Sequence, residues 1–221
     1  IETRMTNNNL KIAITGHTEG IGKEIYDYFE LFGHNVKGFA RANGYDLSVD
    51  YQKVIDEIIE WDADIVYNNA WSYGNQAQLH ILKTLHEHWK DKRKSIISTG
   101  SASGYAKDKV GNDVYANDKE ALSEYAKKSA MLWPHKNKCK VQNVSFGYVQ
   151  TKFLKGVHNF ENYIPVEAAA KILIDLYHDR KRPYVIAEQL VTHKMTSKEE
   201  HENLKKIVTT NVTESVLKSY V

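Results

Sequence analysis

The sequence predicts an α/β fold in which a parallel sheet is covered by helices on both faces. Short apolar runs alternate with longer amphipathic segments along most of the 221 residues. A cluster of glycines follows the first apolar run directly, at the point where a strand would turn into a helix. Parallel strands need crossover helices that pack on the faces of the sheet, so this alternation favours a doubly wound arrangement.

The strands are expected where short apolar runs are flanked by polar residues. The first run, LKIAIT, is rich in isoleucine and lies between polar segments. Six such runs are present: 10–15, 35–40, 63–68, 95–99, 140–146 and 184–187.

Helices are expected where apolar residues recur at intervals of three and four. Ile21, Ile25 and Phe29 show this spacing in the first helix, and Ser48 is a plausible N-cap for the second. The spacing predicts helices over 20–32, 48–60, the segment around 79–85, 113–133 and the stretch that begins at Pro165. We predict one domain over residues 1–195, followed by a helical tail over 196–221.

Composition excludes several classes of protein. Thirty Lys and Arg against 28 Asp and Glu give a net charge of +2, too weakly basic to favour nucleic acid as the partner. Cys139 is the single cysteine, so an internal disulfide is excluded. With no apolar run of membrane-spanning length and no signal-peptide core, we expect a cytoplasmic protein without a membrane partner. The ten histidines lack metal-ligand spacing, so no metal site is predicted.

The glycine cluster is T-G-H-T-E-G-I-G, residues 15–22. Gly16 suits a tight turn that needs positive φ, and Gly20 lets a phosphate approach the helix N-terminus. Gly22 lets the helix lie close to the sheet. In the first strand–helix turn, this pattern predicts a dinucleotide-binding site.

A second group of residues predicts acid–base chemistry. Tyr115 and Lys119 are four apart on a predicted helix and therefore share a face. A nearby ammonium lowers the pKa of a phenol, and Ser101 at the end of the preceding strand can hydrogen-bond the same substrate oxygen. The group suits proton transfer at an alcohol or carbonyl, beside a cofactor that carries hydride.

Five motifs, in this order, resemble those of the short-chain dehydrogenase/reductase family. They are TGHTEGIG (15–22), NNA (68–70), TGSASG (99–104), YANDK (115–119) and VQT (149–151), and the resemblance covers roughly residues 10–190. The resemblance implies a Rossmann fold with about seven parallel strands and an NAD(P)-dependent oxidoreductase.

It also implies roles for four residues. Tyr115 would be the general acid/base, and Lys119 would bind the nicotinamide ribose and lower the pKa of that tyrosine. Ser101 would orient the substrate carbonyl, and Asn75 would support the lysine through a water. Tyr105 also fits the Tyr-x-x-x-Lys spacing, but it follows Ser101 too closely. Ser98 and Ser103 are the alternatives to Ser101.

The cofactor is expected to be NADP, with NAD possible. Arg41 follows the second strand where an acidic residue would select NAD, whereas Glu19 argues mildly for NAD. Asp46 and Leu47 would flank adenine, and Thr151 would approach the nicotinamide amide. The full set of expected cofactor-binding residues is Gly16, His17, Thr18, Gly20, Ile21, Gly22, Arg41, Asp46, Leu47, Asn69, Ala70, Tyr115, Lys119, Gly147, Val149 and Thr151.

The chain departs from the family pattern at several positions. Trp71 stands where glycine is usual, Phe146 replaces a proline, and Asp118 replaces a small residue beside Lys119. The segment from Thr151 to Pro165 is short for a substrate lid. The site favours a carbonyl/alcohol oxidoreductase with a small-molecule substrate. A non-catalytic cofactor-binding protein and an epimerase- or dehydratase-like relative remain alternatives.

The family resemblance further implies a homodimer or homotetramer that packs through the helix of 113–133. The residues expected at that surface are Ala121, Leu122, Tyr125, Ala126 and Leu132.

Overall fold

The computed structural model describes residues 9–105, 113–132, 138–154 and 162–192. Its strands are β1 (Lys11–Thr15), β2 (Asn35–Phe39), β3 (Ile65–Asn68), β4 (Ser95–Ser101), β5 (Lys140–Phe146) and β6 (Glu188–Val191). Its α-helices are α1 (Gly20–Leu31), α2 (Tyr51–Glu60), α3 (Ala77–Trp89), α5 (Val114–Leu132) and α6 (Val166–His178). The tail predicted over 196–221 lies outside the described residues.

The six strands form one parallel sheet in the order β2-β1-β3-β4-β5-β6. The chain moves from β1 outward to β2 and then crosses back to β3, so the strand order reverses between β1 and β3. In such sheets ligands bind at the carboxyl ends of the strands, at the point of reversal. The glycine cluster, which follows β1, therefore lies at this point of reversal.

The described sheet has six strands, against the predicted number of about seven. Residues 40–50, between β2 and α2, hold only the 3₁₀ turn η1 (Arg41–Asn43) and further turns. A crossover to another parallel strand needs a dozen or more residues. This link is too short for one, so β2 is the edge of the described sheet.

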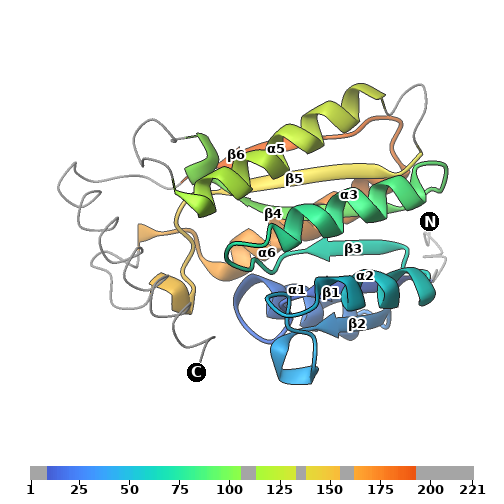
Figure 1. The fold of residues 1–221 in the computed structure, drawn as a ribbon, viewed down its shortest axis with the longest axis horizontal. Coiled ribbons are helices and arrows are strands. Elements are labelled where there is room, and N and C mark those ends of the chain that lie inside the picture. The colour runs from blue at the N-terminus through green and yellow to red at the C-terminus, as the bar shows by residue number, and fades with distance from the viewer. Residues whose placement is uncertain (1–8, 106–112, 133–137, 155–161, 193–221) are drawn as a thin grey trace, which may run out of the picture.

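Helices cover both faces of the sheet, as the sequence predicts (Figure 1). On one face α2, α3 and α5 bury a core that includes Val54, Leu82 and Leu122. On the other face α1 and α6 bury a second core that includes Phe29 and Leu173. The inner strands β1, β3, β4 and β5 are almost entirely buried, which is typical of a parallel sheet.

Two predicted boundaries are wrong. The last strand begins at Glu188 and not at Tyr184, because side chains of β5 bind the preceding carbonyls: Lys140 Nζ donates to Tyr184 O at 2.8 Å. Helix α2 is capped by Asp50, whose carboxylate accepts from Lys53 N at 3.0 Å. Ser48, the predicted cap, instead donates its hydroxyl to Asp46 at 2.7 Å.

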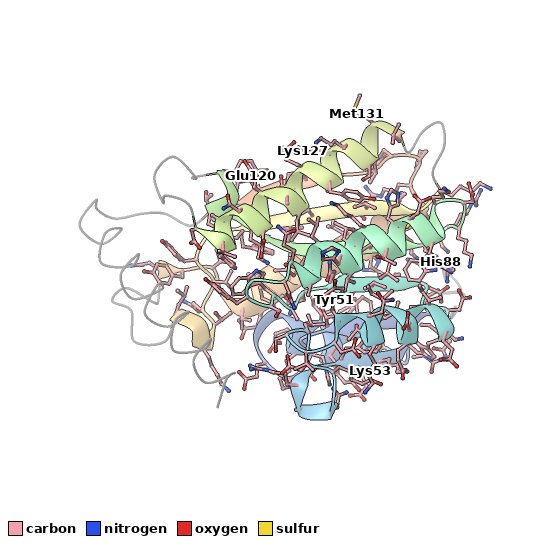
Figure 2. The ribbon with its side chains drawn as sticks, in the orientation of Figure 1. Tyr51, Lys53, His88, Glu120, Lys127 and Met131 are labelled. Carbon is pink, nitrogen blue, oxygen red and sulfur yellow. The ribbon has the colours of Figure 1, made fainter. Side chains whose placement is uncertain are left out.

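The five α5 residues that are predicted to pack against another subunit differ in their burial. Leu122 and Ala126 have no exposed surface and belong to the core, whereas Leu132 is half exposed. Glu120, Lys127 and Met131 lie along the helix on the side away from the sheet (Figure 2). The five predicted residues therefore do not form one free surface.

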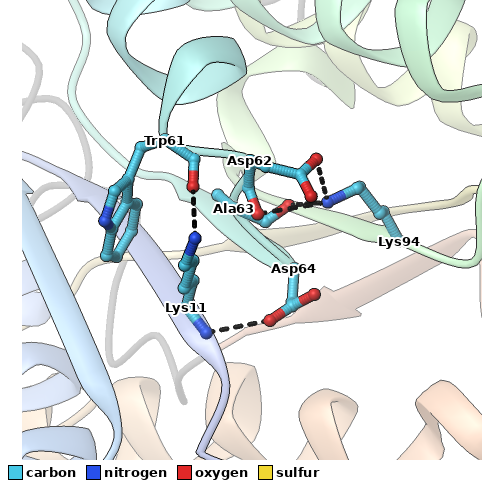
Figure 3. Close-up of polar contacts among 6 residues, drawn as sticks. All are labelled: Lys11, Trp61, Asp62, Ala63, Asp64 and Lys94. Carbon is cyan, nitrogen blue, oxygen red and sulfur yellow. Dashed lines mark hydrogen bonds and ion pairs between the residues drawn. The ribbon is translucent and has the colours of Figure 1, made fainter.

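Polar contacts fasten the amino ends of β1, β3 and β4 (Figure 3). The buried Lys94 ammonium pairs with Asp62 Oδ1 at 2.8 Å and donates to Ala63 O at 2.6 Å. Lys11 Nζ donates to Trp61 O at 3.0 Å, and Lys11 N donates to Asp64 Oδ2 at 2.9 Å. These bonds hold the turn between α2 and β3 at the amino ends of the strands, whereas the glycine cluster lies at the carboxyl ends.

Among the described helices, none combines the length and the apolar character that crossing a membrane requires.

Candidate active site

The glycine cluster forms the turn between β1 and α1, and each glycine is required by its surroundings. Gly16 has φ +71° and donates its N–H to Phe39 O at 2.7 Å. A Cβ on Gly22 would lie 2.1 Å from Gly16 O, so any side chain there would push α1 away from the turn. Gly20 has φ +56° and opens α1 beside Thr151. The turn leaves backbone amides and the positive end of a helix dipole facing the cleft, as anion binding requires.

His17 lies over the second strand. A Cβ on Gly38 would come within 2.2 Å of the His17 ring, so the imidazole rests directly on the backbone of β2. Burial lowers the pKa of His17 below its usual value, which favours the neutral ring. Thr18 and Glu19 are exposed, and Ile21 is buried in the core beneath α1. Glu19 pairs with Lys152 at 2.6 Å, which ties the turn to the segment after β5.

Asn69 and Ala70, just after β3, are bound to the turn that follows β1. The hydroxyl of Thr15 accepts from the N–H groups of both residues at 2.9 Å. Asn69 Nδ2 donates to Thr15 O at 3.3 Å, and Thr99 donates to Asn69 Oδ1 at 3.0 Å. The ends of β1, β3 and β4 are therefore held together at the predicted cofactor cleft.

Lys119 is buried beneath this cleft and is held by neutral acceptors. Its Nζ donates to Gln78 Oε1 at 2.7 Å and to Thr99 O at 2.8 Å. Burial lowers the pKa of Lys119 to about 7, and the charge of Asp118 opposes that shift. The ammonium is thus easily neutralised at physiological pH.

Gln78 is a site residue that the sequence analysis missed. Its Nε2 donates to Asn68 O at 2.6 Å and to Thr99 O at 3.1 Å, which leaves Oε1 to face Lys119. The amide therefore connects β3, β4 and α5. One signal could have revealed it: Gln78 is a polar residue at helical spacing with the apolar Leu82, Leu85 and Trp89.

Asn75, which is predicted to support Lys119 through a water, forms direct hydrogen bonds within its own loop, and the water-mediated contact stays a prediction. Asn75 Nδ2 donates to Leu47 O at 2.6 Å, and its Oδ1 accepts from Ala77 N at 3.1 Å. Gln76, at φ +50°, separates it from the first turn of α3. Asn75 consequently stabilises the loop before the helix, and Gln78 is the amide that contacts Lys119.

Tyr115 and Ser101 lie together at the end of β4. A hydrogen bond with Ser101 lowers the pKa of Tyr115, but burial outweighs it and the net shift is upward. The effect of Lys119 on the pKa of Tyr115 stays a prediction. The Lys119 ammonium lies 5.4 Å from the Tyr115 ring centroid while it donates to Gln78 and Thr99.

The alternative residues take other positions. Tyr105 contacts Ser123 on α5 at 3.2 Å between hydroxyl oxygens, and the Lys127 ammonium lies over its ring. Ser98 is fully buried, with its hydroxyl 3.4 Å from Asn68 Nδ2. Ser103 donates its hydroxyl to Ser101 at 2.9 Å, so it contacts the predicted serine.

The residues expected around the adenosine follow β2. Arg41 is exposed in the turn η1, directly after the strand. The carboxylate of Asp46 accepts from the N–H of Ser48 at 2.9 Å and from its hydroxyl. Leu47 is buried in the core beside α2, and its carbonyl accepts from Asn75 Nδ2.

The last predicted cofactor residues follow β5. Gly147 N donates to Val191 O at 2.7 Å, and Val149 forms a bridge with Ile164. Thr151 lies beside the glycine turn, with its Cγ2 3.5 Å from the position of a Cβ on Gly20. Phe146, which replaces a proline, is buried and pairs with Val191. Residues 155–161 of the expected lid lie outside the described residues.

Among the described residues, no group of three or more His, Cys, Asp or Glu side chains could hold a metal ion. The arrangement suits an anionic, nucleotide-like ligand over the turn between β1 and α1. It also brings a hydroxyl pair and an ammonium together at the end of β4.

Comparison with known proteins adds structural relatives. No family model matches the sequence, and no curated protein matches it. A solved structure of a short-chain dehydrogenase/reductase family oxidoreductase from Burkholderia thailandensis has a TM-score of 0.67 at 19% identity, covering 83% of this chain and 90% of that one. A short-chain dehydrogenase from Burkholderia cenocepacia in complex with NADP gives 0.61 at 18% identity, with 84% and 98% covered.

A 3-alpha-hydroxysteroid dehydrogenase from a Pseudomonas species, complexed with NADH, gives a TM-score of 0.63 at 16% identity, with 82% and 94% covered. Similarity at this level of identity shows a shared fold. The chain therefore has the Rossmann-type fold of short-chain dehydrogenases/reductases, as its motifs predict.

Proposed function

We propose, from this shared fold and the contacts around Lys119, that the chain is a divergent short-chain dehydrogenase/reductase. It would interconvert a carbonyl and a secondary alcohol with NADP(H) as the preferred cofactor. The observation that carries the proposal is the proximity of Tyr115, Ser101 and Lys119 at the carboxyl end of β4. The three solved relatives include one complexed with NADP and one with NADH.

The residues around the turn fit a dinucleotide. A Cβ on Gly16 would lie 3.1 Å from Ala70 Cβ, and a Cβ on Gly22 would collide with Gly16 O. Both glycines therefore allow the turn after β1 to pack closely against its neighbours. The amides at the start of α1 would hold the pyrophosphate. Asn69, Ala70 and Thr151 would line the nicotinamide side. The cofactor supplies or accepts the hydride when it is bound.

Tyr115 and Ser101 would handle the proton and the substrate oxygen. The Tyr115 hydroxyl would donate its proton to the carbonyl oxygen during reduction and accept it back during oxidation. Its raised pKa keeps it protonated at neutral pH, which suits the donor role. Ser101, already in contact with the tyrosine, would orient the substrate oxygen.

Lys119 would bind the nicotinamide ribose. An ammonium has three N–H donors, and Gln78 and the Thr99 carbonyl take two of them. The third remains for a ribose hydroxyl or for a water that leads to Tyr115. Gln78 would be a positioning residue, because its own hydrogen bonds determine where the ammonium lies.

Arg41 supports NADP over NAD, because an exposed guanidinium after the second strand can bind the 2′-phosphate. Replacing Arg41 by Ala should weaken NADPH binding by about tenfold, the effect of losing one charge-assisted contact, and leave NADH binding unchanged. Isothermal titration with both cofactors measures this. Arg93→Ala, an exposed substitution between α3 and β4, is the matched control. Equal losses for both cofactors would contradict a role at the 2′-phosphate.

The acid/base assignment is tested by Tyr115→Phe. Carbonyl-dependent NADPH oxidation should fall by about 10²–10⁴-fold, while NADPH affinity stays within a small factor of wild type. Tyr105→Phe, at the competing motif, should retain activity because that side chain contacts α5. Undiminished activity in Tyr115→Phe would refute the assignment. Cofactor binding without turnover of any carbonyl by wild type would favour the non-catalytic alternative.

A further inference from the structure

Trp71 and Asp118, two residues that depart from the family pattern, contact each other beside Tyr115. Trp71 follows Ala70 in the loop after β3, and Asp118 precedes Lys119 on α5. Trp71 Nε1 donates to Asp118 Oδ2 at 3.0 Å. The indole also packs at right angles to the Tyr115 ring, with 4.9 Å between ring centroids. The two departures therefore form a single feature of the site.

The hydrogen bond to Asp118 holds the indole in place. Asp118 is only 4% exposed, and a buried carboxylate is costly unless a donor pairs with it. If the indole moved away, Asp118 would lose this donor. The Tyr73 ring lies at right angles to the indole, with 6.0 Å between ring centroids, and Tyr73 is half exposed. The aromatic surface thus extends from Tyr115 toward solvent.

The indole occupies the space beside the Tyr115 ring. Ser101 contacts Tyr115, and the Lys119 ammonium lies 5.4 Å from its ring centroid. With these neighbours in place, a substrate substituent next to Tyr115 would have to fit against Trp71. A glycine at position 71 would leave that volume open.

We propose that Trp71, held by Asp118, forms a fixed aromatic wall that limits the substrates to carbonyl compounds with at least one small substituent, such as aldehydes and methyl ketones. This inference rests on the proposed function and names the substrate class of the same site. Asp118 acts through the indole and is a positioning residue, whereas Trp71 determines specificity.

The test compares reduction of a small ketone, butan-2-one, with that of a bulky one, benzophenone, by the full chain with NADPH. Trp71→Ala should raise the ratio of kcat/KM for benzophenone over butan-2-one by at least about tenfold, because it removes the wall. Asp118→Ala should raise this ratio by a smaller factor, because the indole loses its acceptor. Trp71→Phe keeps a ring and should leave the ratio within about threefold of wild type.

Two controls keep the result interpretable. Trp61→Phe changes a tryptophan at the opposite edge of the sheet and should not alter the ratio. If Trp71→Ala fails to fold, Trp71→Leu keeps apolar bulk in the loop and should still raise the ratio. A readout without substrate is the exchange of the Trp71 indole proton by NMR, which should be slow in wild type and faster in Asp118→Ala.

Failure of the proposed function is distinguishable from failure of the wall. If wild type reduces neither ketone, the proposed function fails, and the dissociation constants of the two ketones for the NADPH-loaded protein then test the wall. Trp71→Ala should improve binding of benzophenone relative to butan-2-one. An unchanged ratio in Trp71→Ala, in turnover or in binding, overturns the inference.

Discussion

Two buried lysines, one at the amino ends and one at the carboxyl ends of the strands, have different hydrogen-bond partners. Lys94, at the amino edge, is 8% exposed and pairs with a carboxylate of Asp62 as well as two backbone carbonyls. Lys119, at the carboxyl edge, is 3% exposed and donates to an amide oxygen and one carbonyl, both neutral. Within the described residues, no carboxylate forms an ion pair with Lys119.

The difference separates a structural lysine from a functional one. The Lys94 hydrogen bond lowers the pKa of Asp62, which favours the ionised carboxylate, and the pair holds the turn between α2 and β3. Lys119 forms no such ion pair among the described residues, and burial lowers its pKa to about 7 although the charge of Asp118 opposes that shift. A buried ammonium without an ion-pair partner lowers the stability of the fold. Strongly shifted pKa values of this kind are typical of residues that act on a ligand.

The largest expected effects come from exchanging each lysine for Met. Lys119→Met should reduce carbonyl-dependent NADPH oxidation by about 10²–10⁴-fold, because the ribose contact and the charge beside Tyr115 are lost. Lys94→Met should leave kcat unchanged but lower the free energy of unfolding by about 3 kcal/mol, because two carbonyls and Asp62 lose their donor. Steady-state kinetics and urea unfolding measure the two effects. If both variants lost kcat to the same extent, Lys119 would not differ from Lys94 in function.

The second expected effect is on the pH dependence of stability. The unfolded chain keeps Lys119 protonated up to about 10.5, whereas the folded chain releases that proton near pH 7. The unfolded state therefore binds more protons between these values, so this residue makes stability rise with pH, by about 1.4 kcal/mol per unit.

In Lys119→Met that contribution should be absent. The slope of unfolding free energy against pH between 7.5 and 9.5 should fall by about 1.4 kcal/mol per unit relative to wild type. Lys94→Met serves as the comparison. A wild-type slope that Lys119→Met does not change would show that the lysine keeps its proton in the folded state.

A smaller effect is expected from Gln78→Leu. The variant removes one acceptor from Lys119 and the Nε2 donor that Gln78 provides to the carbonyls of Asn68 and Thr99, so the free energy of unfolding should fall by about 2 kcal/mol. If Gln78 is only structural, the variant should change the free energy of unfolding alone. If Gln78 positions Lys119, the variant should also lower the pKa of Lys119. NMR titration of the lysine Nζ measures this shift, with Gln52→Leu on the exposed face of α2 as control. An unchanged pKa would make Gln78 structural only.

Local sequence patterns predict much of the fold. The apolar runs and helical spacings identify the strands and helices, and the glycine turn follows from the spacing of Gly16, Gly20 and Gly22. The sequence predicts about seven strands and the described sheet has six, because the link between β2 and α2 is too short to hold another strand and its crossover. The start of β6 was wrong because side chains of β5, which no local pattern reveals, bind the carbonyls before it.

The candidate site is predictable where it depends on motif spacing. Ser101, Tyr115 and Lys119 come together as their spacing predicts. Asn75 and Gln78 show the limit: both are amides near the start of α3, and only the hydrogen bonds to Asn68 and Thr99 determine which one contacts the lysine. The Trp71–Asp118 contact joins residues 47 positions apart, and no spacing rule connects them.

The most direct test of the central claim is titration of the Lys119 Nζ by NMR in ¹⁵N-lysine-labelled protein, with and without NADPH. The account predicts a midpoint near 7 in the free protein and an upward shift when the cofactor phosphates and ribose bind beside it. A midpoint that stays near 10.5 in both states would contradict it, because Lys119 would then be an ordinary structural lysine.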